Sequence, residues 1–168
     1  PEAKRDQPMS DSFLDPERIP DPCVLVIFGA SGDLTRRKLV PAVWHLQQQG
    51  RLPDEFALVG VARREMDDES FRQQMREALE EFVGSVDTAG IEPFLQKLHY
   101  VRGDLDEAST YTDLDQRLRQ LDESTGTQGN RCYYCSVPPQ IYLDIVHRLG
   151  ESGLNREGED GRGWSRIV

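Results

Sequence analysis

The sequence predicts an α/β protein with a Rossmann-like, doubly wound parallel sheet, built as a single three-layer α/β/α domain. Its length of 168 residues suits one domain. Two runs, residues 23–28 and 56–62, are apolar almost throughout, as expected of strands buried on both faces of a parallel sheet. Short β-branched runs then alternate with longer amphipathic stretches, which is typical of parallel strands joined by right-handed helical crossovers.

The short apolar runs are the expected strands, over residues 23–28, 56–62, 98–101, 132–137 and 164–168. Gly29 interrupts the first strand. Pro138 and Pro139 stop the fourth, because proline has no amide hydrogen to donate to a sheet. A polar turn is expected over 124–130, and a loop rich in glycine and charge over 151–163.

The stretches between the strands are the expected helices, over residues 34–49, 67–82, 91–97, 107–121 and 140–149. In the second helix, Phe71, Met75 and Leu79 recur at helical spacing and mark the face toward the core. Gly50 is a suitable C-cap for the first helix. Pro41 lies inside that helix and should kink it or reset its start, because proline cannot donate a hydrogen bond to the preceding turn.

Charge and composition exclude several classes of partner. The net charge is −10, and nucleic acid and anionic membranes both repel an acidic surface. No apolar stretch is as long as a membrane span. Residues 1–21 are charged and proline-rich, without the apolar core of a signal peptide. We expect a flexible leader over 1–21, a domain over 22–168 and a cytoplasmic location.

The turn after the first strand is the first candidate for ligand binding. It lies between a buried strand and a helix, as a phosphate-binding turn requires, and glycine allows a close approach to an anion. The usual fingerprint is G-x-G-x-x-G, and here Ser31 and Leu34 stand at its second and third glycine positions. A purely structural turn is the alternative. The candidate cofactor-binding residues of this turn are Gly29, Ala30, Ser31, Gly32, Asp33 and Leu34.

The end of the second strand indicates which dinucleotide would bind. NAD-binding proteins usually have an acidic residue there for the ribose 2′-hydroxyl, whereas NADP-binding proteins supply arginine for the 2′-phosphate. This sequence has Arg63 and Arg64 at that point, with no acid before Glu65. A guanidinium suits phosphate because its donors form a planar fork. We therefore predict NADP as the cofactor, with Arg63 as the favoured phosphate ligand and Arg64 as a weaker candidate.

Two further segments lie near the expected cleft. Arg36, Arg37 and Lys38 oppose the dipole at the start of the first helix, so they serve either an anion or a solvated basic face. Lys38 is a candidate cleft residue. The fourth strand ends in residues 136–139, and ligands of open α/β sheets bind beyond the carboxyl ends of strands. These four residues are therefore expected near the cofactor, with simple strand termination as the alternative.

Cysteine and histidine give no metal site and no catalytic group. Cys132 and Cys135 are three residues apart in an expected strand and should point to opposite faces. We interpret them as structural thiols, with a redox role as the alternative. The histidines have no metal-ligand spacing with cysteine or carboxylate side chains. No residue of the chain is predicted to be catalytic.

The glycine turn also carries a resemblance to a known family. Residues 29–41, with the pattern G-A-S-G-D-L-x-x-x-K-x-x-P, resemble the start of glucose-6-phosphate dehydrogenases. Residues 59–63, 131–139 and 163–168 are similar to later segments of that family. The resemblance implies a pyrophosphate site at the glycine turn, Arg63 at the 2′-phosphate, Val137 and Pro138 by the nicotinamide, and Lys38 near the cleft.

The resemblance also implies an activity that this sequence does not complete. The family oxidises the C1 hydroxyl of glucose 6-phosphate to the lactone, passes a hydride to NADP and feeds the pentose phosphate pathway. Its enzymes are commonly dimers or tetramers. The family continues with an E-K-P-F-G motif and with a domain that carries the catalytic histidine, and this sequence has neither. We therefore expect an NADP-binding domain that is inactive alone, with sugar binding and homo-oligomer formation confined to the full-length enzyme.

Two other functions remain open from the sequence. The first is a non-catalytic NADP-binding module with a regulatory or scaffold role. The second is an NADP-dependent oxidoreductase that acts on a different sugar phosphate.

Overall fold

The computed structural model describes residues 18–84, 87–158 and 162–168 and contains a parallel five-stranded sheet in the order β3-β2-β1-β4-β5. The strands are β1 (Cys23–Phe28), β2 (Phe56–Ala62), β3 (Leu98–Arg102), β4 (Arg131–Cys135) and β5 (Ser165–Ile167). The winding reverses between β1 and β4. The Rossmann-like fold class predicted from the sequence is confirmed.

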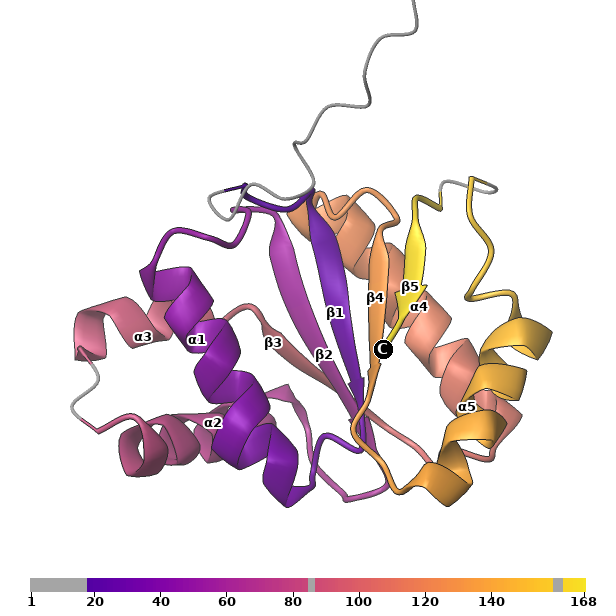
Figure 1. Cartoon of the computed structure of the whole chain (residues 1–168), viewed down its shortest axis with the longest axis horizontal. Coiled ribbons are helices and arrows are strands. Elements are labelled where there is room, and N and C mark those ends of the chain that lie inside the picture. The colour runs from indigo at the N-terminus through magenta and orange to yellow at the C-terminus, as the bar shows by residue number, and fades with distance from the viewer. Residues whose placement is uncertain (1–17, 85–86, 159–161) are drawn as a thin grey trace, which may run out of the picture.

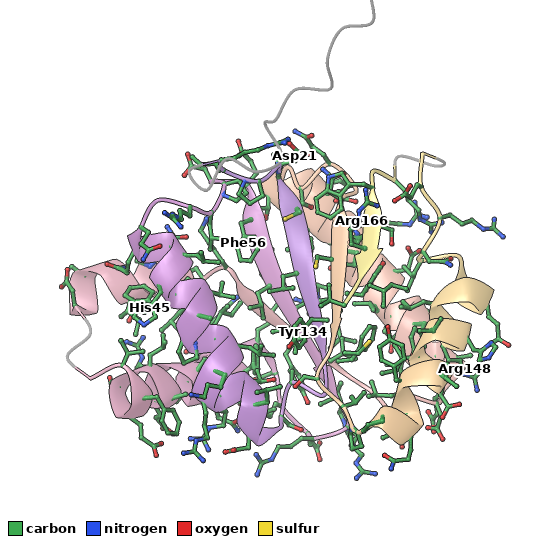
Figure 2. The ribbon with its side chains drawn as sticks, viewed as in Figure 1. Asp21, His45, Phe56, Tyr134, Arg148 and Arg166 are labelled. Carbon is green, nitrogen blue, oxygen red and sulfur yellow. The ribbon has the colours of Figure 1, made fainter. Side chains whose placement is uncertain are left out.

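Within the described ranges, five α-helices cover the two faces of this sheet (Figure 1). They are α1 (Val40–Gln48), α2 (Asp68–Phe82), α3 (Thr88–Leu95), α4 (Ala108–Thr125) and α5 (Pro139–Ser152). The first three pack on one face and the last two on the other. Side chains from both faces of the sheet fill the space toward the helices (Figure 2). The domain is thus the three-layer arrangement that the sequence predicts.

Each layer of helices encloses its own hydrophobic core. On one side, Trp44 of α1 and Phe71 of α2 are buried against the sheet. On the other side, Tyr111 of α4 and Ile145 of α5 are buried. All residues of β2 are buried, because the strand lies inside the sheet and between both cores. Burial of each large apolar side chain stabilises the fold by about 1.5–3 kcal/mol.

The first helix shows how the chain accommodates Pro41. A π-helical turn over Thr35–Leu39 precedes α1, and the Val40 amide donates to the Thr35 carbonyl five residues back. Pro41 lies in the first turn of α1, where its missing amide costs little. The sequence predicts that this proline kinks the helix or resets its start. The backbone is helical from Asp33 to Gln48, and the π-turn before Pro41 is a feature that the sequence did not indicate.

Three helices depart from the predicted bounds because their caps lie elsewhere. Helix α3 begins earlier than expected, since the Asp87 carboxylate accepts a hydrogen bond from the Ala89 amide at 3.1 Å. Helix α4 extends into the segment expected to be a turn and ends at Gly126, whose φ is +78°. Helix α5 likewise continues to Gly153, at φ +70°. Both glycines adopt the left-handed conformation that commonly ends helices.

A buried ion pair fixes the start of β4 at Arg131, one residue before the predicted strand. Its guanidinium donates to both carboxylate oxygens of Asp122, at 2.9 and 2.5 Å. Asp122 also accepts hydrogen bonds from the Thr127 hydroxyl and the Gly129 amide. Burial raises the pKa of Asp122, but Arg131 and Thr127 lower it overall. The charged residue is therefore part of the strand because a carboxylate from α4 neutralises it.

The expected leader over 1–21 lies outside the described residues except for its last four. None of the helices in the described ranges has the length and apolar character that crossing a membrane requires.

Candidate functional site

A sharp turn joins β1 to the first helical turn. Gly29 has φ of +81°, a conformation that glycine adopts without strain. A Cβ atom at this position would lie 2.2 Å from the Ser136 carbonyl oxygen. Glycine is therefore needed at Gly29 both for its backbone angle and for the close approach of the turn to the end of β4.

The amides of this turn fall into two groups. Gly29 and Ala30 donate to the Val61 carbonyl at 2.9 and 3.3 Å, and Gly32 donates to the Gly29 carbonyl at 3.0 Å. The turn is thereby fastened to the end of β2. The amides with no such partner in the described part of the chain are those of Ser31, Asp33 and Leu34. They lie at the start of the helix, where free amides and the helix dipole favour an anion.

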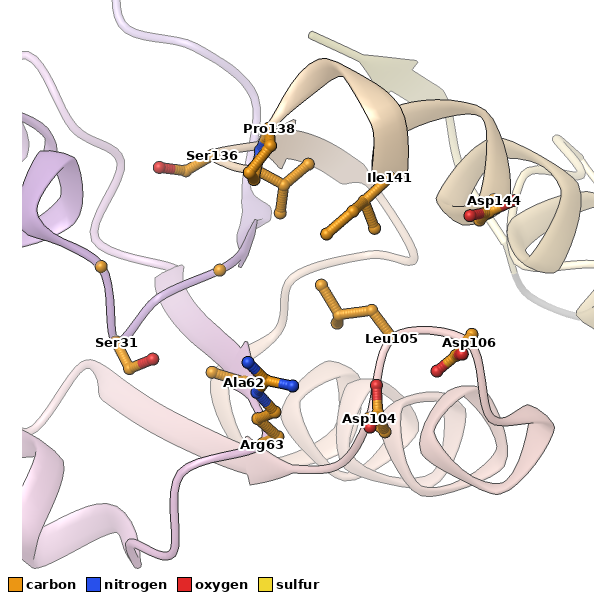
Figure 3. Close-up of a pocket in the computed structure, with 13 residues that line it drawn as sticks. Ser31, Ala62, Arg63, Asp104, Leu105, Asp106, Ser136, Pro138, Ile141 and Asp144 are labelled. Carbon is orange, nitrogen blue, oxygen red and sulfur yellow. The ribbon is translucent and has the colours of Figure 1, made fainter.

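The turn forms one wall of a pocket with a volume of about 460 Å³. Figure 3 shows this pocket beyond the carboxyl ends of the strands. Its volume is typical of small-molecule and cofactor sites. The lining residues come from the ends of four strands and the start of α5: Gly29, Ser31, Gly32, Ala62, Arg63, Asp104, Leu105, Asp106, Ser136, Val137, Pro138, Ile141 and Asp144.

Most of the predicted cofactor-binding residues lie in this lining, namely Gly29, Ser31, Gly32, Arg63, Val137 and Pro138. The other three do not. Ala30 is fully buried beneath the turn, where its side chain faces Gly60. Leu34 and Asp33 are exposed at the helix start, and Asp33 pairs with Arg37 at 3.5 Å. These three residues can therefore contribute backbone groups to the site rather than side chains.

The two arginines after β2 have different surroundings. Arg63 lines the pocket, and no hydrogen bond or ion pair with another described residue engages its side chain. Arg64 is exposed and absent from the lining. Its backbone carbonyl accepts a hydrogen bond from the Tyr100 hydroxyl at 2.8 Å. The geometry thus favours Arg63 over Arg64 as the residue that faces a bound ligand.

The basic residues of the first helical turn have local partners. Arg36 pairs with Glu81 at 3.6 Å, and Arg37 pairs with Asp33. Lys38 is exposed and is not in the pocket lining. The acidic partners account for two of the three cations without a ligand, and the role of Lys38 in the cleft stays a prediction.

Sequence reasoning missed the acidic side of the pocket. Asp104, Leu105 and Asp106 follow β3, and the rule that ligands bind beyond the carboxyl ends of strands would have found them had it been applied there. Ile141 and Asp144 come from α5. No sequence signal could have identified these two, because their position depends on how the helix lies against the sheet.

The directions of the cysteine side chains and their raised pKa values both fit a structural role. Across the β1–β4 pair, Cys132 lies opposite Leu25 and Cys135 opposite Phe28, so the two cysteines point to opposite faces as predicted. Burial raises the pKa of Cys132 and of Cys135, and it raises the pKa of Cys23 to about 11. All three cysteines are free thiols and stay protonated near neutral pH. The reactive species of cysteine is the thiolate, so burial suppresses their reactivity.

The pocket lining contains carboxylates but no histidine. Within the described ranges, no group of three or more His, Cys, Asp or Glu side chains is arranged to hold a metal ion. The pocket therefore offers one cation, carboxylates, backbone amides and apolar surface.

Comparison with known proteins matches most of the chain to a family model. Residues 26–168 match the family described as "Glucose-6-phosphate dehydrogenase, NAD binding domain". The chain is 46% identical over 157 residues to glucose-6-phosphate 1-dehydrogenase of Chlamydia pneumoniae, covering 92% of this chain and 31% of that protein. It is 43% identical over 146 residues to the enzyme of Aggregatibacter actinomycetemcomitans, covering 87% and 29%. The chain thus spans about a third of the length of the curated relatives it matches.

Solved structures give the same result. A glucose-6-phosphate dehydrogenase in complex with its substrate glucose 6-phosphate matches with a TM-score of 0.75 and 29% identity, over 89% of this chain and 30% of that one. Glucose-6-phosphate 1-dehydrogenase from Mycobacterium avium matches with a TM-score of 0.70 and 25% identity, over 87% of this chain and 29% of that one.

Proposed function

The chain belongs to the glucose-6-phosphate dehydrogenase family, and we propose that its pocket is the NADP site of such an enzyme. The observation that carries this proposal is that the glycine turn and Arg63 line the same pocket. The free amides of the turn would bind the diphosphate, and Arg63 would bind the 2′-phosphate. Family membership favours this dehydrogenase over a non-catalytic dinucleotide-binding module.

The charges at the end of β2 support NADP over NAD. The first acid after β2 along the chain, Glu65, pairs with Arg102 at 3.5 Å, so it is engaged with another side chain rather than being a free acceptor for a ribose hydroxyl. Arg63 has no ion-pair partner among the described residues. A guanidinium in that state is ready for a phosphate, with which it can form two parallel hydrogen bonds.

The residues present fit a dinucleotide along the whole pocket. The first-turn amides and Arg63 provide two anion-binding points, and Val137 and Pro138 provide an apolar wall on the other side of Gly29. The Ser136 amide donates a hydrogen bond to the Phe28 carbonyl at 3.0 Å, which holds this wall beside the turn. Bound NADP would supply the hydride acceptor, and the role of these residues is to bind and orient it.

We propose that the complete enzyme oxidises glucose 6-phosphate and that this chain alone does not. Removing a hydroxyl proton as the hydride leaves requires a positioned base. The pocket lining contains no histidine and no lysine, and its carboxylates lie on the wall built by the β3–α4 loop and α5. The purified chain should therefore form no NADPH from glucose 6-phosphate, and measurable turnover would contradict this assignment.

Titration calorimetry with NADP and NAD tests the cofactor assignment. The wild-type chain should prefer NADP, and Arg63→Ala should weaken NADP binding by roughly tenfold to a hundredfold, the usual value of a charge-assisted hydrogen bond. Binding of NAD should change little.

Arg64→Ala is the matched control, because it removes the same charge one residue away and keeps the backbone carbonyl that Tyr100 uses. It should leave the preference for NADP intact. An unchanged ratio of NADP to NAD affinity in Arg63→Ala would refute the assignment of Arg63.

A further inference from the structure

One wall of the pocket combines an unengaged carboxylate with two apolar side chains. Asp104 and Leu105 follow β3, and Ile141 lies in the first turn of α5. Figure 3 shows the side chains of Leu105 and Ile141 pointing toward one another across the pocket. Asp104 is exposed, and none of the described residues forms a hydrogen bond or ion pair with its carboxylate.

This wall is the immediate neighbour of Arg63. The Gly103 amide donates to the Ala62 carbonyl at 3.0 Å, which joins the carboxyl ends of β2 and β3. Arg63 and Asp104 are the next residues along each chain segment, and both line the pocket. A ligand group bound at Arg63 therefore has Asp104 as its neighbour on the β3 side.

The loop that carries Asp104 is held firmly. The Asp104 backbone carbonyl accepts a hydrogen bond from the Thr110 hydroxyl at 2.6 Å, and the Leu105 carbonyl accepts one from the Tyr111 hydroxyl at 2.7 Å. Arg148 of α5 donates to the Asp106 carbonyl. The backbone of the loop is thereby tied to α4 and α5, which fixes the position from which the Asp104 side chain extends.

We infer that Asp104 recognises the base of the dinucleotide by accepting a hydrogen bond from the exocyclic amine of adenine, while Leu105 and Ile141 contact the ring. The inference rests on the proposed function, because it needs the 2′-phosphate at Arg63. The base is attached to the ribose carbon next to the one that carries this phosphate. A ribose held at Arg63 must therefore direct its base to an adjacent wall, and the β3 side offers both apolar surface and a hydrogen-bond acceptor.

The carboxylate of Asp104 can distinguish purine bases by the group that they carry at position 6. An ionised carboxylate can only accept hydrogen bonds. Adenine presents an amine at position 6 of the purine, whereas hypoxanthine and guanine present a carbonyl oxygen there. At position 6, Asp104 would thus accept a hydrogen bond from adenine, whereas in the other two bases a carbonyl oxygen would face its negative charge. The site would select an adenine dinucleotide through a side chain rather than only through the shape of the pocket.

The direction in which a charge-removing substitution changes NADP affinity distinguishes base recognition from charge repulsion alone. A carboxylate close to a bound 2′-phosphate repels it. On charge alone, Asp104→Asn should therefore tighten NADP binding. A hydrogen bond from adenine to Asp104 predicts the opposite, because the neutral amide is a weaker acceptor than the carboxylate.

The test compares NADP with nicotinamide hypoxanthine dinucleotide phosphate, which differs only at the base, by titration calorimetry on the full chain. The wild type should bind the hypoxanthine analogue about tenfold more weakly. Asp104→Asn should bind NADP more weakly than the wild type does. It should also bring the ratio of the two affinities close to one, because its amide can donate to the carbonyl oxygen of hypoxanthine.

Asp144→Asn is the matched control, since it removes a carboxylate from another part of the same pocket wall. It should keep the tenfold ratio and bind NADP at least as tightly as the wild type.

Each other result overturns the inference at a definite point. Equal affinity of the wild type for the two dinucleotides would refute base recognition and leave the proposed function intact. No binding of either would refute both. If Asp104→Asn changed the ratio of NADP to NAD affinity but not the ratio between the two bases, Asp104 would act through Arg63 and base recognition would be wrong.

Discussion

Replacing Gly29 with alanine should destabilise the chain more than the same replacement at Gly50. Both glycines have positive φ, +81° and +65°, so both substitutions carry the strain of an L-residue in that region, about 1–2 kcal/mol. Only the new Cβ atom at Gly29 also clashes with backbone atoms. Its Cβ would lie 2.2 Å from the Ser136 carbonyl oxygen, whereas nothing lies within 4 Å of a Cβ at Gly50.

The structure gives the size of the difference. Contacts of a Cβ atom below 3.0 Å essentially do not occur, so the turn and the end of β4 must separate by at least about 0.8 Å in Gly29→Ala. Comparable overpacking costs about 1–3 kcal/mol. We expect Gly50→Ala to lose about 1–2 kcal/mol and Gly29→Ala about 2–5 kcal/mol of unfolding free energy.

Urea unfolding followed by tryptophan fluorescence measures both losses, because Trp44 is only 3% exposed and reports on the core. The separation should also disturb the diphosphate turn, so Gly29→Ala should bind NADP more weakly than Gly50→Ala. Equal losses of stability in the two variants would refute the close approach between the turn and Ser136.

Two further predictions concern charged networks away from the pocket. Asp122→Ala leaves the buried guanidinium of Arg131 unpaired and should cost about 3–5 kcal/mol; a loss below about 1 kcal/mol in urea unfolding would contradict the buried pair. Burial raises the pKa of Asp68, but His99, the Tyr100 amide and the Arg117 guanidinium lower it well below its usual range. Its stabilisation is therefore present above the unfolded pKa of about 3.9 and is lost as pH falls below it. The unfolding free energy of Asp68→Asn should depend less on pH between about 5 and 3 than that of the wild type, and equal slopes would contradict this.

Sequence patterns predicted the central strands of the sheet well, because strands buried on both faces are continuous apolar runs. The bounds of β1 and β2 agree with the prediction, since both strands are uninterrupted apolar runs closed by glycine or arginine. The start of β4 was missed by one residue. Arg131 is charged, and the tertiary contact with Asp122 is what allows it to be part of a buried strand.

Helix ends were harder to predict because their caps depend on local geometry. The helix predicted over 91–97 starts three residues late, because α3 begins at Thr88 with Asp87 as its cap and includes Pro93. The π-helical turn before Pro41 has no sequence signature either. Proline shows that the regular hydrogen bond is missing but does not show how the backbone responds.

The candidate site was predictable where it depends on strand order and unpredictable where it depends on helix packing. A turn after β1 and a residue after β2 must meet in this topology, which is why Gly29 and Arg63 were found together. Asp104 obeys the same rule but stood after the third strand, where no motif drew attention to it. Ile141 reaches the pocket only because of the way α5 packs against the sheet.

The most direct test of the central claim is NMR of the isotope-labelled chain during titration with NADP and then with NAD. The account predicts that the amide signals of Ser31, Asp33 and Leu34 move with both dinucleotides, because both carry the diphosphate. The Arg63 side-chain Nε signal should move only with NADP. If the Arg63 signal stayed fixed while that of Arg64 moved, or if the amide changes mapped away from the glycine turn, the pocket would not be the NADP site.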